Sequence, residues 1–479
     1  MVMQWLFLAA TLTSAIPDHS DGYFPDLTRT RVENVKVSGE GGPVILVVVD
    51  AMRPDRMSTY GFERETTPHL SKLADDGVIF TNYYVNGNWT RPTSTTMLTG
   101  LPPVAHRVEK QVDRLAQDIP TLAQTLAAKG IPTGAVVGNG NAGSVYGLDR
   151  GFTYYADTVK HWKGLPTAQN VVDLGLPFIE KNQNDPFFLM LFMVDPHDPY
   201  GAPGPYEDYF VKDKSVRLIR TPHWEKGNYS KAEVERMKAT YDGSVRYVDE
   251  TLGKLFSKLK KMGLYEKSTI IVTSDHGEAF GEHGVFMHSH HLYDEIIRAP
   301  LIIKPPSISK KAGYNHYLFD STDLMPTVLG WYQVAPLTKL PGVDIIHSLE
   351  NPSANDPHRR IVTEFNHFGI HRATVRSYTG KVIYSAPVDE KEFRSTVGSR
   401  SLLPSVSFDK EWVRMYDLSR DPFEKNCLYN EKPAQFGHLS KLLKEIRSYR
   451  AGRPSKPSVP ATAVDEETLK DLKTMGYID

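Results

Sequence analysis

The sequence contains a single cysteine, Cys427, among its 479 residues. A disulfide within the chain, a cysteine-based zinc site and a Cys-x-x-Cys redox pair are therefore excluded. The net charge of −1 at pH 7 provides no basic surface for nucleic acid. No apolar run reaches the roughly 20 residues that a membrane-spanning helix needs, so we expect no transmembrane segment in the mature protein.

The N-terminal segment is the one stretch with a targeting pattern. Its apolar run from Trp5 to Leu12 is followed by small residues up to Ala15, as before a cleavage site, although no Lys or Arg precedes the run. We expect residues 1–16 to be a signal peptide and the protein to be exported, to the periplasm or the extracellular space. The alternative is a packed or frayed N-terminal segment.

Short apolar runs recur along the chain and alternate with longer segments of helical spacing. The 40% apolar and 24% charged fractions are those of an ordinary globular protein. Strands that are apolar on both faces and alternate with helices predict an α/β fold with a largely parallel sheet. The expected strands are 44–49, 133–138, 187–194, 269–273 and 301–304, and the expected helices include 67–77, 118–130 and 245–263.

The character of the sequence changes after about residue 350. A polar link with Pro and Asn, 348–359, precedes short strand-like segments and a helical pattern at 435–450, and a Pro- and Ser-rich tether follows at 450–466. We therefore expect a catalytic domain at 42–350 and a smaller C-terminal α+β subdomain with a helical tail at 358–479.

Three of the predicted strands end in side chains that can do chemistry. Asp50 follows the first strand, His197 lies just after the third, and the pair Asp275–His276 follows the fourth. Ligands in open α/β sheets collect beyond the carboxyl ends of the strands, so we expect these residues to share one site. A carboxylate after a strand also often caps the next turn, but three such strands in one domain favour a functional site.

A segment rich in threonine and serine surrounds Pro92. Proline is typical of the first residue of a helix, which predicts that Thr90 lies beside a helix N-terminus, where anions bind favourably. With Asp50, Asp275 and His276, the Thr90 hydroxyl would complete four ligands for one divalent cation. Mixed oxygen and nitrogen ligands suit Zn²⁺ or Mn²⁺, and a bound metal makes a hydroxyl a usable nucleophile.

In their order and spacing, these segments resemble the sulfatase branch of the alkaline phosphatase superfamily over roughly residues 42 to 479. The resemblance implies an alkaline phosphatase-like, mostly parallel sheet flanked by helices, with a smaller C-terminal α+β domain, and a metal-dependent ester hydrolase. The segments that carry it include VVVDAMRPDRMSTYG, TRPTSTTMLTG, DPHDPY, TSDHGEAFGEHG, LYDEIIRAPLIIKPP and MYDLSRDPFEKNCL.

Four positions depart from the sulfatase pattern. Sulfatases begin a Cys-x-Pro-x-Arg pentapeptide with a Cys or Ser that is oxidised to formylglycine, whereas this chain has Thr90 there and Ser94 in place of the Arg. Ala51 stands where sulfatases usually carry a second Asp for calcium, and His276 follows Asp275 where they have an Asn. The resemblance therefore implies hydrolysis of a phosphate ester (a phosphodiester, phosphonate monoester or phosphomonoester) through a Thr alkoxide.

The alternatives are sulfate ester hydrolysis without formylglycine, transfer of a phospho-headgroup to an alcohol, and a non-enzymatic protein that binds anionic glycans. The expected partner is a small-molecule, glycan or lipid ester. Nucleic acid is not expected, and a homo-oligomer is left open.

The resemblance also implies roles for side chains around the metal. His197 resembles the family's substrate-facing His, which contacts the anion or protonates the leaving group; alternatively, it pairs with a neighbouring Asp to order its loop. His288 or His290 occupies the place of a Lys or His that faces the anion. Asn139 is expected to line the pocket, with packing as the alternative. A second metal ion, held by the histidine tract with His197 and Asp195, is the alternative to a single ion.

Overall fold

The structure is a computed structural model that describes residues 30–157, 166–222, 228–309, 313–367, 369–388, 390–391, 393, 406–429, 437–452 and 459–460. The expected signal peptide and the expected C-terminal tail beyond residue 460 lie outside these ranges. Within them, no helix combines the length and the apolar character that crossing a bilayer requires.

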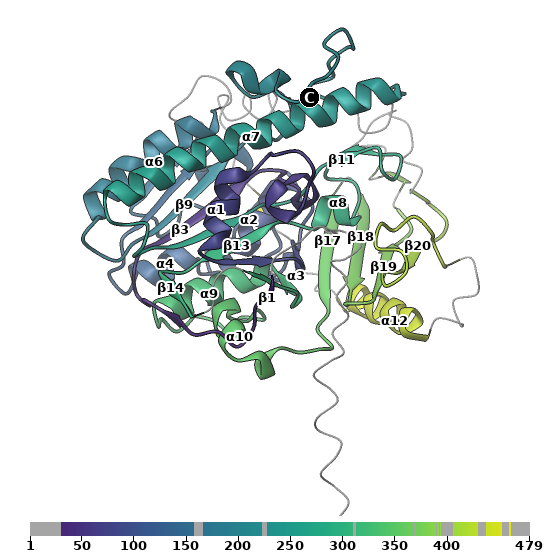
Figure 1. The fold of residues 1–479 in the computed structure, drawn as a ribbon. Helices are drawn as coiled ribbons and strands as arrows, with labels where there is room; N and C mark the ends of the chain where they lie inside the picture. Colours follow the sequence, from purple (N-terminus) through teal and green to yellow (C-terminus); the bar gives the residue numbers. More distant parts are fainter. Residues whose placement is uncertain are drawn as a thin grey trace, which may run out of the picture.

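A large, mostly parallel sheet forms the centre of the described structure (Figure 1). Its strands, in spatial order, are β1 (Thr30–Arg31), β15 (Gly313–Asn315), β4 (Val78–Phe80), β13 (Leu301–Lys304), β10 (Thr269–Thr273), β3 (Val44–Val49), β9 (Phe188–Met193), β7 (Thr133–Val137) and β8 (Tyr154–Asp157). Only β13 runs antiparallel to its neighbours among these strands. The other pairs are parallel, as strands alternating with helices predict.

Helices cover both faces of this sheet, because the central strands are apolar on both sides. In β3, Ile45 and Val47 point into one core, whereas Val44 and Leu46 point into the other. The helices on the Ile45 face are α1 (Pro68–Asp75), α6 (Ala168–Asn182) and α7 (Lys231–Lys261), and those on the Val44 face include α2 (Thr90–Thr99), α4 (Leu122–Ala127) and α9 (Leu324–Trp331).

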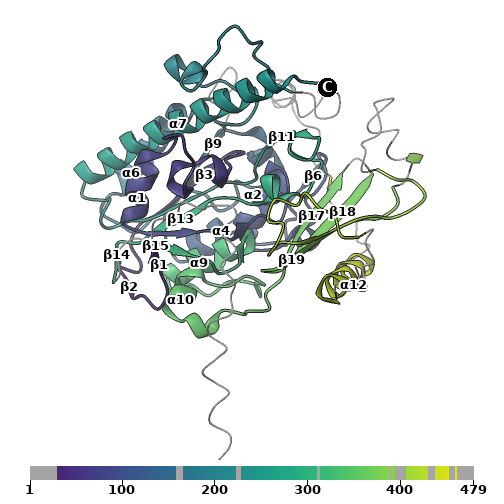
Figure 2. The same cartoon turned by 45° about the vertical axis from the view of Figure 1, so that its right-hand side comes forward.

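A smaller antiparallel sheet, the C-terminal sheet, lies beside the large one (Figure 2). It consists of β17 (Ile361–His367), β18 (Ile370–Arg376), β19 (Gly380–Ser385) and β20 (Trp412–Asp417), and α12 (Gly437–Ala451) covers one of its faces. Ile361, Phe365 and Ile383 on the other face belong to the core of the large sheet. The two sheets therefore share a continuous apolar interface.

The apolar runs predicted the central strands closely. The structure has strands at 44–49, 269–273 and 301–304 as expected, and its strands at 133–137 and 188–193 are one and two residues shorter than predicted. The longest helix differs more, since α7 begins at Lys231, fourteen residues before the expected start. Its first turn is polar and is fixed by a capping box between Ser230 and Glu233, which the apolar spacing does not reveal.

Candidate active site

The predicted site residues lie at the carboxyl ends of four adjacent parallel strands. Asp50 follows β3, and its neighbours β10 and β9 lead into Asp275 and His197, respectively. Asn139 comes two residues after β7, the next strand along. Parallel strands end at the same edge of a sheet, so residues from four distant segments meet there.

The start of α2 brings Thr90 to the same edge. The helix begins at Thr90 itself, with Trp89 as its N-cap, so the expectation that Pro92 would be the first helical residue was wrong. Pro92 is the third residue, where a missing N–H costs little because first-turn amides have no partner within the helix. Thr90 is fully buried at the helix N-terminus.

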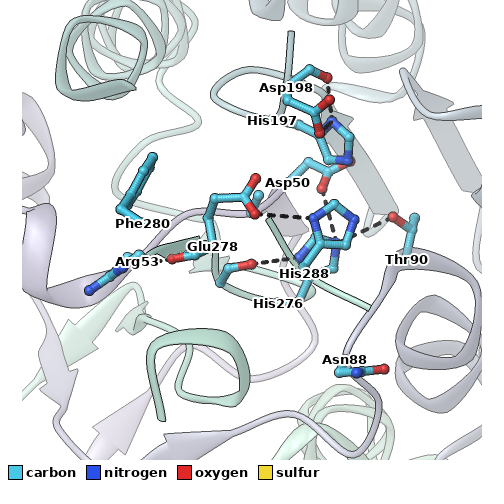
Figure 3. Close-up of polar contacts among 12 residues, drawn as sticks. Asp50, Arg53, Asn88, Thr90, His197, Asp198, His276, Glu278, Phe280 and His288 are labelled. Atoms are coloured by element: carbon cyan, nitrogen blue, oxygen red, sulfur yellow. Dashed lines mark hydrogen bonds and ion pairs between the residues drawn. The ribbon is translucent and has the colours of Figure 1, made fainter. Parts of the chain in front are cut away.

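Four of these side chains meet around one ring nitrogen (Figure 3). Nε2 of His276 lies 3.4 Å from Oδ1 of Asp50, 3.4 Å from Oδ2 of Asp275 and 3.5 Å from the hydroxyl oxygen of Thr90. Nδ1 of His276 lies 2.9 Å from the carbonyl oxygen of Gly277, so it is the nitrogen that carries hydrogen. The lone pair of Nε2 is therefore directed at the group of oxygens, as in a metal-ligating histidine.

The remaining carboxylate oxygens are engaged by the protein itself. Oδ2 of Asp50 accepts a hydrogen bond from the amide of Asn139 at 2.6 Å. Oδ1 of Asp275 accepts from the backbone N–H groups of Ala51 and His276, at 3.2 and 3.0 Å. Oδ1 of Asp50 and Oδ2 of Asp275, by contrast, are buried without a hydrogen-bond partner among the described residues. Two such oxygens beside a histidine lone pair fit a divalent cation.

Burial sets the protonation of this group when no cation is present. It raises the pKa of Asp275 to about 7, with the nearby Asp50 adding to the effect, and it also raises the pKa of Asp50. Burial lowers the pKa of the His276 imidazole to about 3. His276 is therefore in its neutral, ligating form at physiological pH, and a bound cation would favour ionised carboxylates.

A second buried group adjoins the first and contains His197, Asp198 and His288. The ring of His288 is stacked on that of His276, with centroids 4.2 Å apart, and lies 4.8 Å from the ring of His197. Nδ1 of His288 lies 3.3 Å from Oε1 of Glu278. Burial raises the pKa values of Asp198 and Glu278 to about 7.

Two residues that the sequence offered for this region have other surroundings. Asp195, considered for a second metal, accepts a hydrogen bond from the N–H of Ala168 at 2.8 Å, at the start of α6. The ring of His290 packs against Phe365 of the C-terminal sheet, with centroids 6.4 Å apart. Of the two histidines expected here, the structure therefore places His288 in the second group, and Asp198 lies there where Asp195 was considered.

Sequence reasoning gave no role to Glu278 or Asn88, both of which are fully buried at the site. Glu278 stands two residues after His276, and Asn88 two residues before Thr90. Proximity to a predicted ligand was the available signal, but it does not distinguish a side chain that faces the site from one that faces away.

The chain matches a family model described as Sulfatase over residues 43–334, which is more than half of its length. It belongs to the sulfatase family. Enzymes of this family bind a divalent metal. The matched range contains every residue of the two buried groups.

Relatives within the family differ in name. The chain is 26% identical over 339 residues to an ulvan-active sulfatase of Formosa agariphila. The match covers 64% of this chain and 65% of that protein, so the chain spans just under two thirds of the relative's length. It is 25% identical over 383 residues to the multifunctional alkaline phosphatase superfamily protein PehA of Trinickia caryophylli, covering 60% of this chain and 73% of that one. The fold is similar to that of a phosphonate monoester hydrolase from Silicibacter pomeroyi, with a TM-score of 0.68, 19% identity and coverage of 86% and 96%.

Proposed function

We propose that this protein hydrolyses phosphate esters through a Thr90 alkoxide, with one divalent cation, Zn²⁺ or Mn²⁺, bound by Asp50, Thr90, Asp275 and His276. The observation that carries the proposal is the identity of the hydroxyl beside the candidate ligands. Thr90 cannot become formylglycine, and its oxygen lies 3.5 Å from Nε2 of His276 and 3.2 Å from the amide of Asn139.

In the first step, the Thr90 hydroxyl gives up its proton to solvent, and the alkoxide attacks phosphorus in line with the leaving oxygen. A bond from phosphorus to Thr90 forms as the bond to the leaving oxygen breaks, and protonated His197 gives its proton to that oxygen. Water then attacks the phosphorus of the phosphothreonine ester and returns a proton to His197 as the Thr90 alkoxide leaves. The cation, when bound, lowers the pKa of the Thr90 hydroxyl and offsets charge on the non-bridging oxygens.

His197 and His288 are assigned to the substrate side of the site. Each retains 4% of its surface exposed, whereas Asp50, Thr90 and His276 retain none. An ester approaching from solvent would meet the two imidazoles first. Asn139 was expected to line the pocket for substrate; because its amide contacts Asp50 and Thr90, we assign it to orienting these two side chains instead. His290, the other candidate for substrate contact, has its ring packed on Phe365.

Sulfate ester hydrolysis is the second candidate. It is favoured by the names of several relatives, among them the ulvan-active sulfatase and an arylsulfatase of Clostridium perfringens that matches 84% of this chain. Against it stands the missing formylglycine precursor, because a plain threonine sulfate ester lacks the elimination route by which a formylglycine hydrate releases sulfate. A transferase would differ from a hydrolase in being accelerated by an added alcohol.

The test is a substrate panel on the metal-loaded protein with nitrophenyl phosphate, bis-nitrophenyl phosphate, a nitrophenyl phosphonate and nitrophenyl sulfate. We expect turnover of a phosphorus ester that is lost in Thr90→Ala and partly retained in Thr90→Ser, which keeps a hydroxyl. Thr95→Ala is the matched control, since Thr95 lies on the same helix and its hydroxyl donates to the Arg91 carbonyl at 2.8 Å. Turnover of the sulfate alone, or activity that survives Thr90→Ala, would refute the proposal.

Metal analysis of the same sample separates one ion from two. One equivalent per chain agrees with the proposal, whereas two equivalents would assign the second ion to His197, Asp198 and His288.

Export is likewise a proposal, to be tested by finding the protein outside the cytoplasm in a form that lacks residues 1–16.

A further inference from the structure

The backbone around His288 is held in an unusual conformation. Met287 and Ser289, which flank His288, have φ angles of 65° and 68°. Residues other than glycine rarely adopt this left-handed region, and they do so mainly where surrounding contacts hold them. The position of the His288 ring therefore depends on whatever holds this loop.

Asn88 makes one set of contacts that fix the backbone around His288. The carbonyl oxygen of Asn88 accepts a hydrogen bond from the N–H of Ser289 at 3.1 Å, and its side-chain amide donates to the carbonyl of His291 at 3.1 Å. Asn88 is fully buried and lies below Thr90 in Figure 3. Asn88 thus binds the loop that carries His288, residues 287–291, at two points: the N–H of Ser289 and the carbonyl of His291.

The C-terminal sheet makes a second contact that fixes the loop carrying His288. Nη1 of Arg372, on β18, donates to the carbonyl oxygen of His290 at 2.7 Å. Arg372 is fully buried, and its guanidinium lies over the ring of Trp412 at 4.8 Å from the centroid. The loop is therefore fixed from both sides, by the segment that leads into Thr90 and by the smaller sheet.

We propose that Asn88 is a positioning residue that fixes the His288 ring against the rings of His276 and His197. Arg372 is the second residue that holds the loop carrying His288. Asn88 precedes Thr90 by two residues. One short segment therefore supplies both the candidate nucleophile and the residue that positions His288. The inference rests on the proposed function only in requiring that the site turns over an ester; it does not depend on whether that ester contains phosphorus or sulfur.

A double-mutant cycle tests this assignment. Asn88→Ala removes the side-chain bond to the His291 carbonyl and leaves the backbone bond to Ser289. We expect it to lower kcat by between about tenfold and a hundredfold, since small displacements of a catalytic group are costly. In a His288→Ala background the same substitution should change kcat less than about twofold, because the side chain through which it acts is gone. Equal losses in both backgrounds, or no loss in either, would overturn the proposal.

Asn82→Ala is the matched control for Asn88. Asn82 is also buried, and its side-chain amide donates to the carbonyl of His316 at 2.9 Å, away from the His288 loop. It should show a similar change in melting temperature with kcat close to that of the wild type. A kcat loss in Asn82→Ala equal to that in Asn88→Ala would reduce the effect to general destabilisation and overturn the proposal.

Arg372→Lys provides a second variant if Asn88→Ala fails to fold. Its loss of kcat should also disappear in the His288→Ala background, whereas Arg414→Lys should retain kcat, because Arg414 lies over the same Trp412 ring but donates to the carbonyl of Val413. Additive losses from Arg372→Lys and His288→Ala would again count against the proposal. The cycle is measured on whichever ester the wild type hydrolyses, so a failed phosphate assignment in the substrate panel is distinguishable from a failed role for Asn88.

Discussion

The hydroxyl oxygen of Thr90 lies 3.5 Å from Nε2 of His276, although 186 positions separate the two residues in the sequence. The helix N-terminus that carries Thr90 and the strand end that carries His276 meet at one edge of the large sheet. The contact joins the candidate nucleophile to the candidate metal ligands.

Replacing Asp275 by Asn should remove most of the bound metal. The substitution deletes the charge beside Nε2 of His276, and changing a metal ligand weakens binding strongly. Metal content of the purified protein, measured by mass spectrometry, is the readout. Asp195→Asn is the control, because an Asn oxygen can still accept the hydrogen bond from Ala168 that begins α6. Unchanged metal content in Asp275→Asn would exclude this group as the metal site.

The affinity for metal should rise with pH between about 5.5 and 8, because burial raises the pKa values of both Asp275 and Asp50 and a cation must displace their protons. Burial raises the pKa of Asp275 to about 7, so below that pH a cation must displace its proton. His276, whose pKa burial lowers to about 3, is already neutral over this range and adds no competing proton. Calorimetric titration of the metal-free protein between about pH 5.5 and 8 should show roughly a tenfold gain per pH unit for each displaced proton. An affinity that does not vary with pH would contradict this protonation state.

Asn139→Ala should lower kcat by between about tenfold and a thousandfold and change KM much less. The Asn139 amide lies 2.6 Å from Oδ2 of Asp50 and 3.2 Å from the Thr90 hydroxyl, so its loss frees both side chains. Steady-state kinetics on the ester found in the panel is the measurement. Asn170→Ala serves as the control, because Asn170 caps α6 instead. A change confined to KM would mean that Asn139 only contacts substrate.

Lys381→Met should destabilise the protein by about 3 to 5 kcal/mol, because it removes the cation that buried Glu424 and Asp294 share and leaves Asp294 paired with Arg376 alone. The Lys381 ammonium lies 2.7 Å from Oδ1 of Asp294 and 2.7 Å from Oε1 of Glu424, and all three side chains are buried. This network joins β19 of the C-terminal sheet to the start of α8 (Asp294–Ile297). Urea unfolding at fixed metal concentration measures the effect.

The control for this prediction is the ion pair between Arg447 and Glu411, whose side chains are 42% and 31% exposed. Arg447→Ala should cost no more than about 1 kcal/mol, since exposed pairs are screened by water. Equal losses in Lys381→Met and Arg447→Ala would show that the buried network contributes little to stability.

Much of the fold is written locally in the sequence. The runs at 44–49, 269–273 and 301–304 are strands because continuous apolar residues pack well only when both faces of a strand are covered. The rule that ligands gather at the carboxyl ends of strands predicts from the sequence alone that Asp50 and Asp275 lie together. Their roles as metal ligands remain predictions, but their proximity required no tertiary information beyond the order of strands and helices.

The tertiary structure decided the finer choices. His288 and His290 lie in the same histidine tract. In the structure, the backbone at Met287 and Ser289 is left-handed, and the ring of His288 lies against that of His276. Asp195 and Asp198 are three positions apart, yet Asp195 accepts a hydrogen bond from the first residue of α6, whereas Asp198 adjoins His197. Hydrophobic periodicity fixes strands and helices over short distances. The orientation of a loop side chain depends on buried contacts with distant segments, such as that of Arg372 with His290, and these form only when the two sheets pack together.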